Sequence, residues 1–270
     1  MMNFENQQTQ TITDFGKQWQ KYQDNEGYYA SVNLLSDIFS NLLDTKDLKN
    51  CQVVEIGSGS GRIVDMLLSS EVACVTAVEP SEAYEILCKN VSHAGDRVTC
   101  LQITGDALPP SGNFDYAFSI GVLHHIPNPV PVVKAAFASL QPGGRLLIWL
   151  YGKEGNRLYL AIAKIMRLFT TRLPDRALDL VVKLLDIPLV IYLSLCKIFP
   201  LPLHQYMKGH LGKLSRQNRQ LTIFDQLNPA YAKYYTREEA MELMQSGGFV
   251  DLKIEPRHGY SWTLIGTKPE

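Results

Sequence analysis

Short apolar runs alternate with amphipathic stretches between residues 30 and 150. The runs have the length of strands, and the stretches between them repeat their apolar positions with the helical period of 3.6 residues. Strands that alternate with helices favour a parallel sheet covered by helices on both faces. The pattern predicts strands at residues 52–56, 73–78, 98–103, 114–119 and 145–150, and helices at residues 30–43, 62–69, 81–92 and 131–140.

The C-terminal part closes this pattern. Residues 236–246 form a predicted helix with a capping box, in which Thr236 is the N-cap and Glu239 lies three positions on. Two apolar stretches, 250–255 and 261–268, predict two further strands joined by a turn. We expect an α/β fold, namely a Rossmann-like parallel sheet with helices on both faces, an antiparallel last strand and a helical insert after strand five. The expected divisions are N-terminal lid helices at 1–49, a core at 50–154, the insert at 155–225 and a closing helix and strand pair at 226–270.

Composition narrows the class of protein. The chain has 270 residues, of which 46% are hydrophobic, and this is enough for one large buried core. Its net charge of −1 argues against a general polyanion binder. The five cysteines are scattered and form no Cys-x-x-Cys pair, so we expect neither a disulfide framework nor a metal site. The polar N-terminus lacks the order of a signal peptide, and a cytoplasmic location is expected.

The near-neutral total hides one unusual segment. Residues 155–224 contain eleven Lys and Arg but three Asp and Glu, a net charge of +8, and no acid lies between 187 and 224. Apolar positions at helical spacing predict amphipathic helices at 158–169 and 177–185. The first interpretation is a helical cap buried on the sheet. The second is a basic apolar surface that contacts an anionic membrane peripherally. Nucleic acid is not expected, because aliphatic runs, not aromatic residues, separate the cations.

A glycine-rich turn, Glu55 to Gly61, follows the first predicted strand. Glycine lets the backbone approach a ligand closely, and in a Rossmann-like sheet this turn lies at the carboxyl edge, where nucleotide-like ligands bind. The spacing is Gly-x-Gly-x-Gly with Arg62 next, so the last glycine of the dinucleotide fingerprint is missing. An NAD(P) oxidoreductase is therefore the weaker alternative.

Polar residues also follow the other strands. Glu79 ends the second strand, where a carboxylate can accept both hydroxyl hydrogens of a ribose. Asp106 follows the third strand in a Gly-Asp-Ala turn, where its side chain and the backbone could meet an adenine edge. Asp115 begins the fourth strand, and His124 and His125 follow it. Each acid alone could be a solvated strand end, a turn former or a cap. One such element at each of four successive strands is improbable by accident, so together they predict a ligand site.

These motifs resemble the class I S-adenosylmethionine-dependent methyltransferases, especially the small-molecule set called methyltransferase type 11. The resemblance lies in residues 54–61, 78–81, 105–107, 114–115, 122–126 and 140–144. It implies S-adenosyl-L-methionine as cofactor and S-adenosyl-L-homocysteine as product. The binding residues that it implies are Glu55, Gly57, Ser58, Gly59, Glu79, Pro80, Asp106, Ala107, Ile120 and Gly121.

The resemblance also assigns places around the cofactor. Gly57 and Gly59 would lie under the methionine part, beside Ile120 and Gly121, while Glu55 would organise the turn or meet the amine. Glu79 would hold the ribose, and Asp106 with Ala107 would lie at the adenine. In related enzymes an N-terminal segment often folds over the cofactor as a lid.

The expected function is methyl transfer to a small-molecule or a lipid- or sugar-type acceptor, with oxygen favoured over nitrogen or carbon. A hydroxyl acceptor needs a general base, and the candidates are His124, His125 and His258, with a packing role as the alternative for at least one. Trp19, Tyr22, Tyr151 and Tyr235 are candidates for the acceptor pocket, with packing in the core as the alternative. A cofactor-binding partner subunit without activity stays open as another class, and so does a homodimer.

Overall fold

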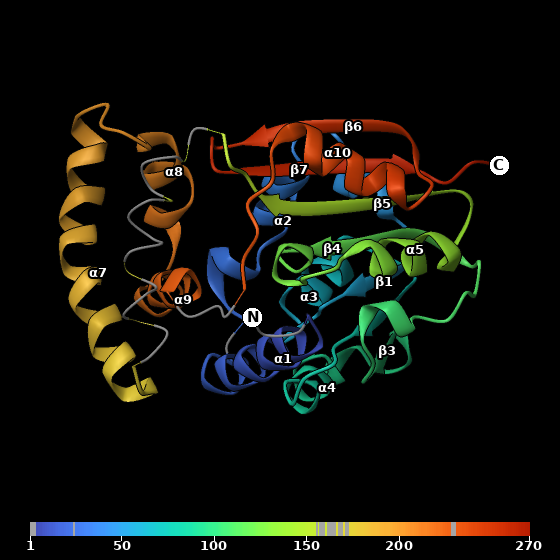
Figure 1. Cartoon of the computed structure of the whole chain (residues 1–270), viewed down its shortest axis with the longest axis horizontal. Helices are drawn as coiled ribbons and strands as arrows, with labels where there is room; N and C mark the ends of the chain where they lie inside the picture. Colours follow the sequence, from blue (N-terminus) through green and yellow to red (C-terminus); the bar gives the residue numbers. More distant parts are fainter. Residues whose placement is uncertain are drawn as a thin grey trace.

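The sheet at the centre of the molecule has seven strands in the order β3-β2-β1-β4-β5-β7-β6 (Figure 1). This computed structural model describes residues 4–23, 25–154, 156, 160, 166, 170, 173–227 and 231–270. The first five strands are parallel, β7 is antiparallel to β5, and β6 is antiparallel to β7. The predicted fold class is thus confirmed. The strands are β1 (Gln52–Ile56), β2 (Cys74–Val78), β3 (Val98–Leu101), β4 (Phe114–Ile120), β5 (Leu140–Tyr151), β6 (Val250–Arg257) and β7 (Ser261–Thr267).

Helices cover both faces of the sheet. Each central strand presents apolar side chains on both of its faces, and both faces must be shielded from water. Val53 packs with α2 and α3, whereas its neighbour Val54 packs with α5 and α10. Figure 1 shows α5 and α10 together on one side. The helices of the core are α1 (Phe4–Lys21), α2 (Val32–Phe39), α3 (Arg62–Ser69), α4 (Tyr84–Asn90), α5 (Val130–Ser139) and α10 (Arg237–Ser246). The 3₁₀ turns are η1 (Gly27–Ala30), η2 (Thr45–Leu48), η3 (Ser92–Arg97), η4 (Gly105–Ala107), η5 (Leu123–His125) and η6 (Leu211–Lys213).

Local hydrogen bonds surround the start of two of these helices. Thr236 and Glu239 form the expected capping box at the start of α10. The helix expected from residue 81 instead begins at Tyr84. In the turn before this helix, the hydroxyl and the N–H of Ser81 both donate to the carboxylate of Glu79, and the Ser81 hydroxyl oxygen accepts from the Ala83 N–H. Ser81 therefore stabilises the turn after β2.

The insert after β5 is helical where it is described. It contains α7 (Asp175–Ile198), α8 (His204–Gly209) and α9 (Arg216–Leu227), and Figure 1 shows α8 and α9 between α7 and the sheet. The expected helix at 158–169 lies outside the described residues apart from isolated positions. The one expected at 177–185 is part of α7, which continues through Pro188. Among the described residues, no helix combines the length and apolarity needed to cross a bilayer.

An ion pair between half-buried Asp37 and buried Arg257 joins α2 to the end of β6. Arg257 is 5% exposed, and its guanidinium donates to the Asp37 carboxylate, with Nε 2.9 Å from Oδ2. His258 Nε2 lies 3.0 Å from the other oxygen of Asp37. Burial alone would raise the pKa of Asp37, but the hydrogen bond from His258 and the charge of Arg257 bring that pKa below its ordinary value. This cluster fixes the outer strands against α2.

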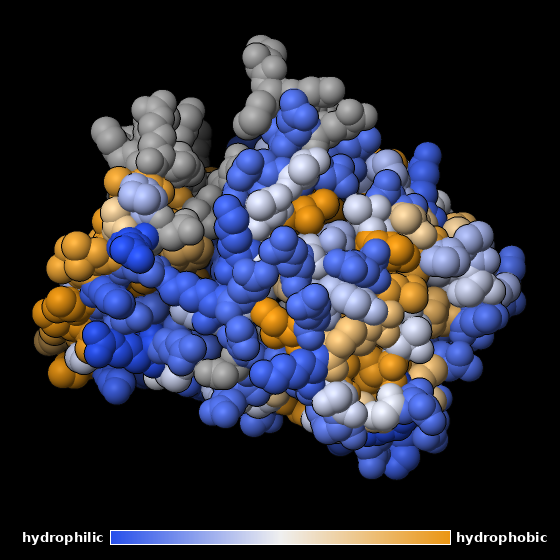
Figure 2. Space-filling model, turned by 90° about the horizontal axis from the view of Figure 1, so that it is seen from below, coloured by the Kyte–Doolittle hydropathy of each residue, from blue (hydrophilic) through white to orange (hydrophobic). Residues whose placement is uncertain are grey.

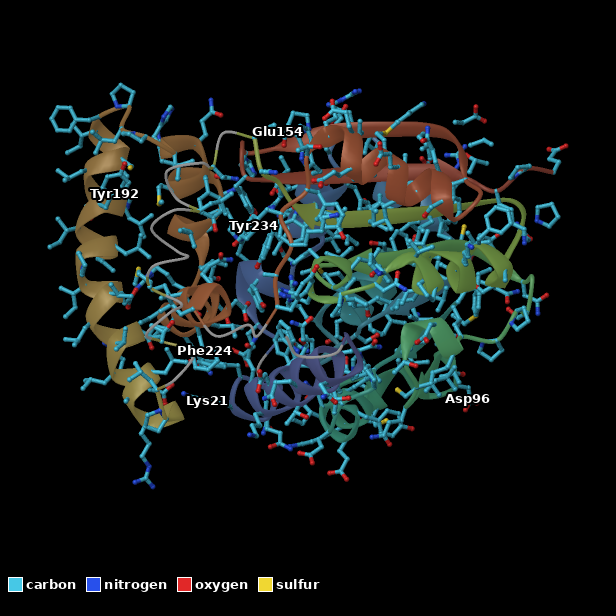
Figure 3. All side chains as sticks on the ribbon, in the orientation of Figure 1. Lys21, Asp96, Glu154, Tyr192, Phe224 and Tyr234 are labelled. Carbon is cyan, nitrogen blue, oxygen red and sulfur yellow. The ribbon has the colours of Figure 1, made fainter. Side chains whose placement is uncertain are left out.

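We expect Asp37→Ala to lower the free energy of unfolding by on the order of 3 kcal/mol, because Arg257 would stay buried without its partner. Urea denaturation measures the loss. The wild-type advantage should be complete above the ordinary Asp pKa of 3.8 and shrink as the pH falls below it, because the native carboxyl resists protonation. Asp96→Ala, at an exposed position of η3 (Figure 3), should change stability by less than about 0.5 kcal/mol. Equal losses for the two variants would contradict the prediction.

Candidate active site

A cavity of about 140 Å³, called here the edge cavity, opens at the carboxyl edge of the sheet. It lies where the chain order reverses between β1 and β4, the place where α/β sheets bind ligands. The glycine turn after β1 forms its floor, and Ile120 and Gly121 after β4 form one wall. Helix α1 contributes Phe15 and Trp19. The cavity is therefore enclosed by sheet-edge loops on one side and the N-terminal helix on the other.

The backbone of the turn after β1 requires glycine. Gly57, Gly59 and Gly61 have φ values of 84°, 52° and 87°, in the left-handed region that side chains disfavour. A Cβ atom on Gly57 would lie 2.4 Å from Val122, and one on Gly59 would lie 2.9 Å from the ring of Trp19. Loss of either glycine would thus displace a wall of the edge cavity.

Two buried carboxyl groups line this cavity, and they differ in whether they have hydrogen-bond donors around them. Glu79 accepts a hydrogen bond from the Gly59 N–H at 2.8 Å and from the Ser81 N–H at 3.0 Å, so it ties the turn after β1 to the turn after β2. Glu55 is 1% exposed, and its Oε2 has no hydrogen-bond partner within the part of the chain that the structure describes. Burial raises the pKa of Glu55 to about 8. A cation in the edge cavity would stabilise the ionised form of Glu55.

A second cavity of about 140 Å³, the polar chamber, adjoins the edge cavity and shares Trp19, Arg62 and His125 with it. Its polar lining also includes His210, Asp225, Gln226, Arg257 and Tyr260. Asp225 accepts a hydrogen bond from Gln18, and burial raises the pKa of its carboxyl to about 7 although Gln18 and Arg62 oppose the shift. The chamber therefore holds a carboxyl that changes charge near neutral pH.

His210 brings a neutral imidazole to the same chamber. Burial lowers the pKa of His210 to about 3, and the positive charge of Arg257 acts in the same direction. Its Nδ1 is buried without a hydrogen-bond partner among the described residues. A bound molecule with a polar group could satisfy this nitrogen.

A third cavity, the apolar chamber, has a volume of about 280 Å³ and lies between the sheet edge and the insert. Leu185 and Leu189 of α7 line it together with Ile223 of α9. It shares Tyr151 and Gln226, among others, with the polar chamber, and the Gln226 amide donates to the Tyr151 hydroxyl at 2.9 Å. The three cavities thus form a series from the β1 turn to the insert.

Most residues predicted to bind the cofactor line the edge cavity. These are Glu55, Gly57, Ser58, Glu79, Pro80, Ile120 and Gly121. Gly59 lies in the same turn, against Trp19. Asp106 and Ala107 are exposed. From this segment, Thr104 and Gly105 line the edge cavity. The third strand thus reaches the cavity through backbone at Gly105, not through the Asp106 side chain.

The three candidate histidines occupy different environments. His125 lines the edge cavity and the polar chamber, and its Nδ1 lies 2.9 Å from the Tyr231 carbonyl oxygen. Because a carbonyl only accepts, Nδ1 carries the hydrogen and Nε2 is the basic nitrogen of the neutral ring. His124 is fully buried with its ring 3.9 Å from that of Tyr151, and His258 is bound to Asp37. His125 is thus the one of the three that lines a described cavity.

The acceptor candidates separate in the same way. Trp19 lines the edge cavity and the polar chamber, and Tyr151 lines both chambers. Tyr22 instead packs against Phe224 of α9, with 6.1 Å between ring centroids. Tyr235 is 1% exposed and belongs to the core under α5 and α10. Neither ring is among the described residues that line the three cavities.

Several lining residues were not expected from the sequence. Arg62, His210, Asp225, Arg257 and Tyr260 come from four separate parts of the chain, and no motif connects them. One signal was available for Asp225, which is the first acid after the acid-free stretch 187–224. An isolated acid beside a basic apolar segment is a candidate for a buried functional group.

Residues 54–148, which supply most of the edge cavity, match the family model described as a methyltransferase domain. They form a class I S-adenosylmethionine-dependent methyltransferase domain. The chain is 28% identical over 113 residues to a tRNA U34 carboxymethyltransferase of Pseudoalteromonas atlantica, covering 41% of this chain and 35% of that protein. It is 25% identical over 146 residues to a ubiquinone biosynthesis O-methyltransferase of Pseudomonas putida, covering 53% and 62%. The chain thus spans about a third to three fifths of these relatives.

The fold extends beyond the matched domain. The structure of Burkholderia thailandensis 1,6-didemethyltoxoflavin-N1-methyltransferase, solved with S-adenosylhomocysteine bound, aligns over 100% of this chain and 92% of that one, with a TM-score of 0.60 and 16% identity. The family, the fold and the type of cofactor expected from the sequence are confirmed. The oxidoreductase alternative has no support.

The residues of the edge cavity fit S-adenosylmethionine. This molecule carries a sulfonium and an ammonium group, and the buried Glu55 carboxylate offers an oxygen without a partner among the described residues. The turn at Gly57 and Gly59 leaves no room for a Cβ, so the backbone itself forms the cavity wall. Glu79 presents a second carboxylate from the end of β2. The donor set is therefore suited to a cationic nucleoside.

We expect Glu79→Ala to weaken binding of S-adenosylhomocysteine by about 1.5–3 kcal/mol, or roughly 10- to 150-fold, because a charge-assisted hydrogen-bond pair is lost. Isothermal titration calorimetry measures the change. Glu85→Ala removes the same charge from an exposed position on α4 and should leave the affinity unchanged.

Glu79 also holds two turns together, so thermal unfolding of each variant must accompany the titration. A folded Glu79→Ala protein with wild-type affinity would contradict the role of this carboxylate in binding.

Proposed function

We propose that this chain transfers the methyl group of S-adenosylmethionine to a hydroxyl oxygen of a small-molecule or lipid-type acceptor held in the polar chamber. The observation that carries the proposal is the junction between the edge cavity and the polar chamber, where Trp19, Gly121 and His125 belong to both walls. A donor in the first cavity and an acceptor in the second would meet at this junction.

Oxygen is favoured because the polar chamber supplies groups that can take a proton. A hydroxyl must lose its proton as it becomes the nucleophile, and a base with a pKa near the working pH serves this best. Asp225 has a pKa raised to about 7 by burial, and His125 offers Nε2 as a basic nitrogen. Asp225 is our first candidate for the general base and His125 the second.

The other contributions of the chain are binding and exclusion of water. The cofactor, when bound, supplies a methyl group already activated by the sulfonium, so little covalent help is needed. Phe15 and Trp19 of α1 cover the edge cavity, and the aromatic rings of Tyr151 and Tyr260 enclose the far side of the polar chamber. Holding the acceptor oxygen in this enclosed space supplies proximity and a low-dielectric environment.

The apolar chamber favours an acceptor with a hydrocarbon part. Aliphatic side chains of three insert helices line it directly beyond Tyr151. One relative is named as a ubiquinone biosynthesis O-methyltransferase and another as a tRNA U34 carboxymethyltransferase. The lining of the two chambers supports an acceptor with a polar part and an apolar substituent. A cytoplasmic location and a homodimer stay proposals from the sequence.

Methyl transfer is tested with S-adenosylmethionine labelled in its methyl group and a panel of phenols and catechols, with and without alkyl chains. We expect labelled methyl ethers, with the alkylated phenols preferred because they fill both chambers. Amines of matched size are the control. Transfer to amines alone would contradict the oxygen assignment. Cofactor binding without transfer to any member of either set would favour a non-catalytic partner protein.

We expect Asp225→Asn to reduce turnover on a phenolic acceptor by about 10²–10⁴-fold, the usual contribution of a general base. In the wild type, turnover should rise with pH through an apparent pKa near 7, because only ionised Asp225 accepts a proton. The residual activity of the variant should lose this rise. Retention of the wild-type pH profile in Asp225→Asn would transfer the role to His125.

A stability measurement checks the Asp225 titration without any acceptor. Because burial raises the pKa of native Asp225 above its ordinary value of 3.8, its stabilising contribution is complete below that value and is lost as the pH rises through about 7. Asp225→Asn should therefore gain stability relative to the wild type between pH 5 and pH 8. Asp96→Asn should show a constant difference from the wild type over the same range.

A further inference from the structure

Large exposed apolar side chains concentrate on the outer face of α7. Of the eleven such residues that the described chain contains, ten lie between Leu173 and Leu203, and the other is Val250 on β6. Most of the exposed apolar residues of α7 follow one another at spacings of three and four residues, so they form one stripe along the helix. The stripe consists of Leu180, Leu184, Ile187, Ile191, Leu195 and Ile198. Figure 2 shows a hydrophobic patch at the end of the molecule where α7 lies.

The opposite face of α7 is well anchored, so the exposed stripe belongs to a firmly placed helix. Leu178 and Val182 are each 1% exposed and pack against Phe224 and Leu227 of α9. The Arg219 guanidinium donates to the buried Asp186 carboxylate, with Nε 2.5 Å from Oδ1. Both faces of α7 are therefore apolar, but α8 and α9 cover only the inner one.

The charges beside the stripe have one sign. Arg176, Lys183 and Lys197 are exposed on α7. The acids whose side chains are described on this helix are occupied, Asp179 by Lys21 of α1 and Asp186 by Arg219. No acid follows between residues 187 and 224, where exposed cations continue with Lys208, Lys213 and Arg216. An apolar stripe flanked by cations complements an anionic lipid surface, whose head groups attract Lys and Arg and whose acyl region accepts the aliphatic side chains.

We propose that the outer face of α7 lies flat on an anionic membrane surface and docks the protein there. The helix is too polar to cross a bilayer but long enough for an interfacial helix. A second copy of this chain could also cover the stripe, but like charges would then face each other across the two-fold axis. An anionic membrane surface complements both the apolar side chains and the cations of this face.

This position would place the apolar chamber next to the lipid. Leu185 and Leu189 line the chamber from the inner face of the same helix, so only the width of α7, about 10 Å, separates the chamber from the docking face. An apolar acceptor could then be taken up from the bilayer. The docking itself does not depend on the proposed methyl transfer.

The test is co-sedimentation of the protein with phosphatidylcholine vesicles that do or do not contain phosphatidylglycerol. We expect binding to the anionic vesicles, weaker binding to the neutral ones, and a decrease with added salt because exposed charges are screened. The double variant Ile187→Gln, Ile191→Gln should lower the affinity about tenfold or more, since two inserted side chains are lost. The substitutions affect residues that are 59% and 60% exposed, and glutamine keeps the helix propensity.

Matched controls separate this face from general stickiness. Val250→Gln changes the exposed apolar residue on β6 and should leave vesicle binding unchanged. Lys183→Gln and Lys197→Gln should each weaken binding about fivefold, equivalent to about 1 kcal/mol per cation near an anionic surface. Lys46→Gln, on the exposed turn η2, should have no effect.

Circular dichroism and calorimetry with S-adenosylhomocysteine establish that each variant is folded and binds the cofactor, so failure of docking and failure of the proposed activity remain distinguishable. Absence of wild-type binding to anionic vesicles, or undiminished binding by the double isoleucine variant, would overturn the proposal. So would a dimer in analytical ultracentrifugation that the isoleucine substitutions dissociate without any vesicle binding, because the face would then belong to a second copy.

Discussion

The carboxylate of Glu79 connects the parts on which the site depends. It accepts hydrogen bonds from the turn after β1 through Gly59 and from the turn after β2 through Ser81, and it lines the edge cavity at the same time. The Ser81 hydroxyl oxygen in turn accepts from the Ala83 N–H, just before α4 begins at Tyr84. A buried backbone N–H needs a hydrogen-bond acceptor, and Glu79 supplies one for Gly59. This bond helps to hold the left-handed glycine turn in place. One buried acid thus orders both loops at the switch point of the sheet.

Around this centre the chain distributes tasks among segments far apart in sequence. The methyltransferase domain supplies the edge cavity, α1 covers it, and residues from the insert and the β6–β7 turn complete the polar chamber. Glu55 and Asp225 lie in adjoining cavities, and burial raises the pKa of both carboxyl groups. A cationic cofactor would favour the ionised form of Glu55. The charge of Arg62 opposes the rise in the pKa of Asp225 only in part, so this carboxyl can exchange a proton with an acceptor in the proposed function. The same physical cause, desolvation, therefore suits one carboxyl to binding and the other to chemistry.

The insert has two apolar faces with different neighbours. Its inner face encloses the apolar chamber and packs on α9, while the outer stripe of α7 is exposed beside cations. The outer residues of such a helix do not stabilise the fold, because their side chains stay exposed to water in the isolated chain. The stripe is accounted for if the protein works at a surface, and a lipid-type acceptor and a lipid surface are chemically consistent with each other.

Hydrophobic periodicity was sufficient to predict the sheet and the helices of the core, because these depend on local spacing. The kind of cofactor was predicted from the resemblance of the motifs at the strand ends to a known family of methyltransferases. The same spacing located Glu55, Gly57 and Glu79 at the cavity, since the carboxyl ends of parallel strands must meet at one edge. It could not distinguish His125 from His124, because neighbouring residues in a loop point in directions that only packing decides. Nor could it bring Asp225, Arg257 and His210 to one chamber, because their contacts join the insert, the last strands and α3 across long sequence separations. Only the tertiary structure decided which polar groups are buried together, and burial is what changes their chemistry.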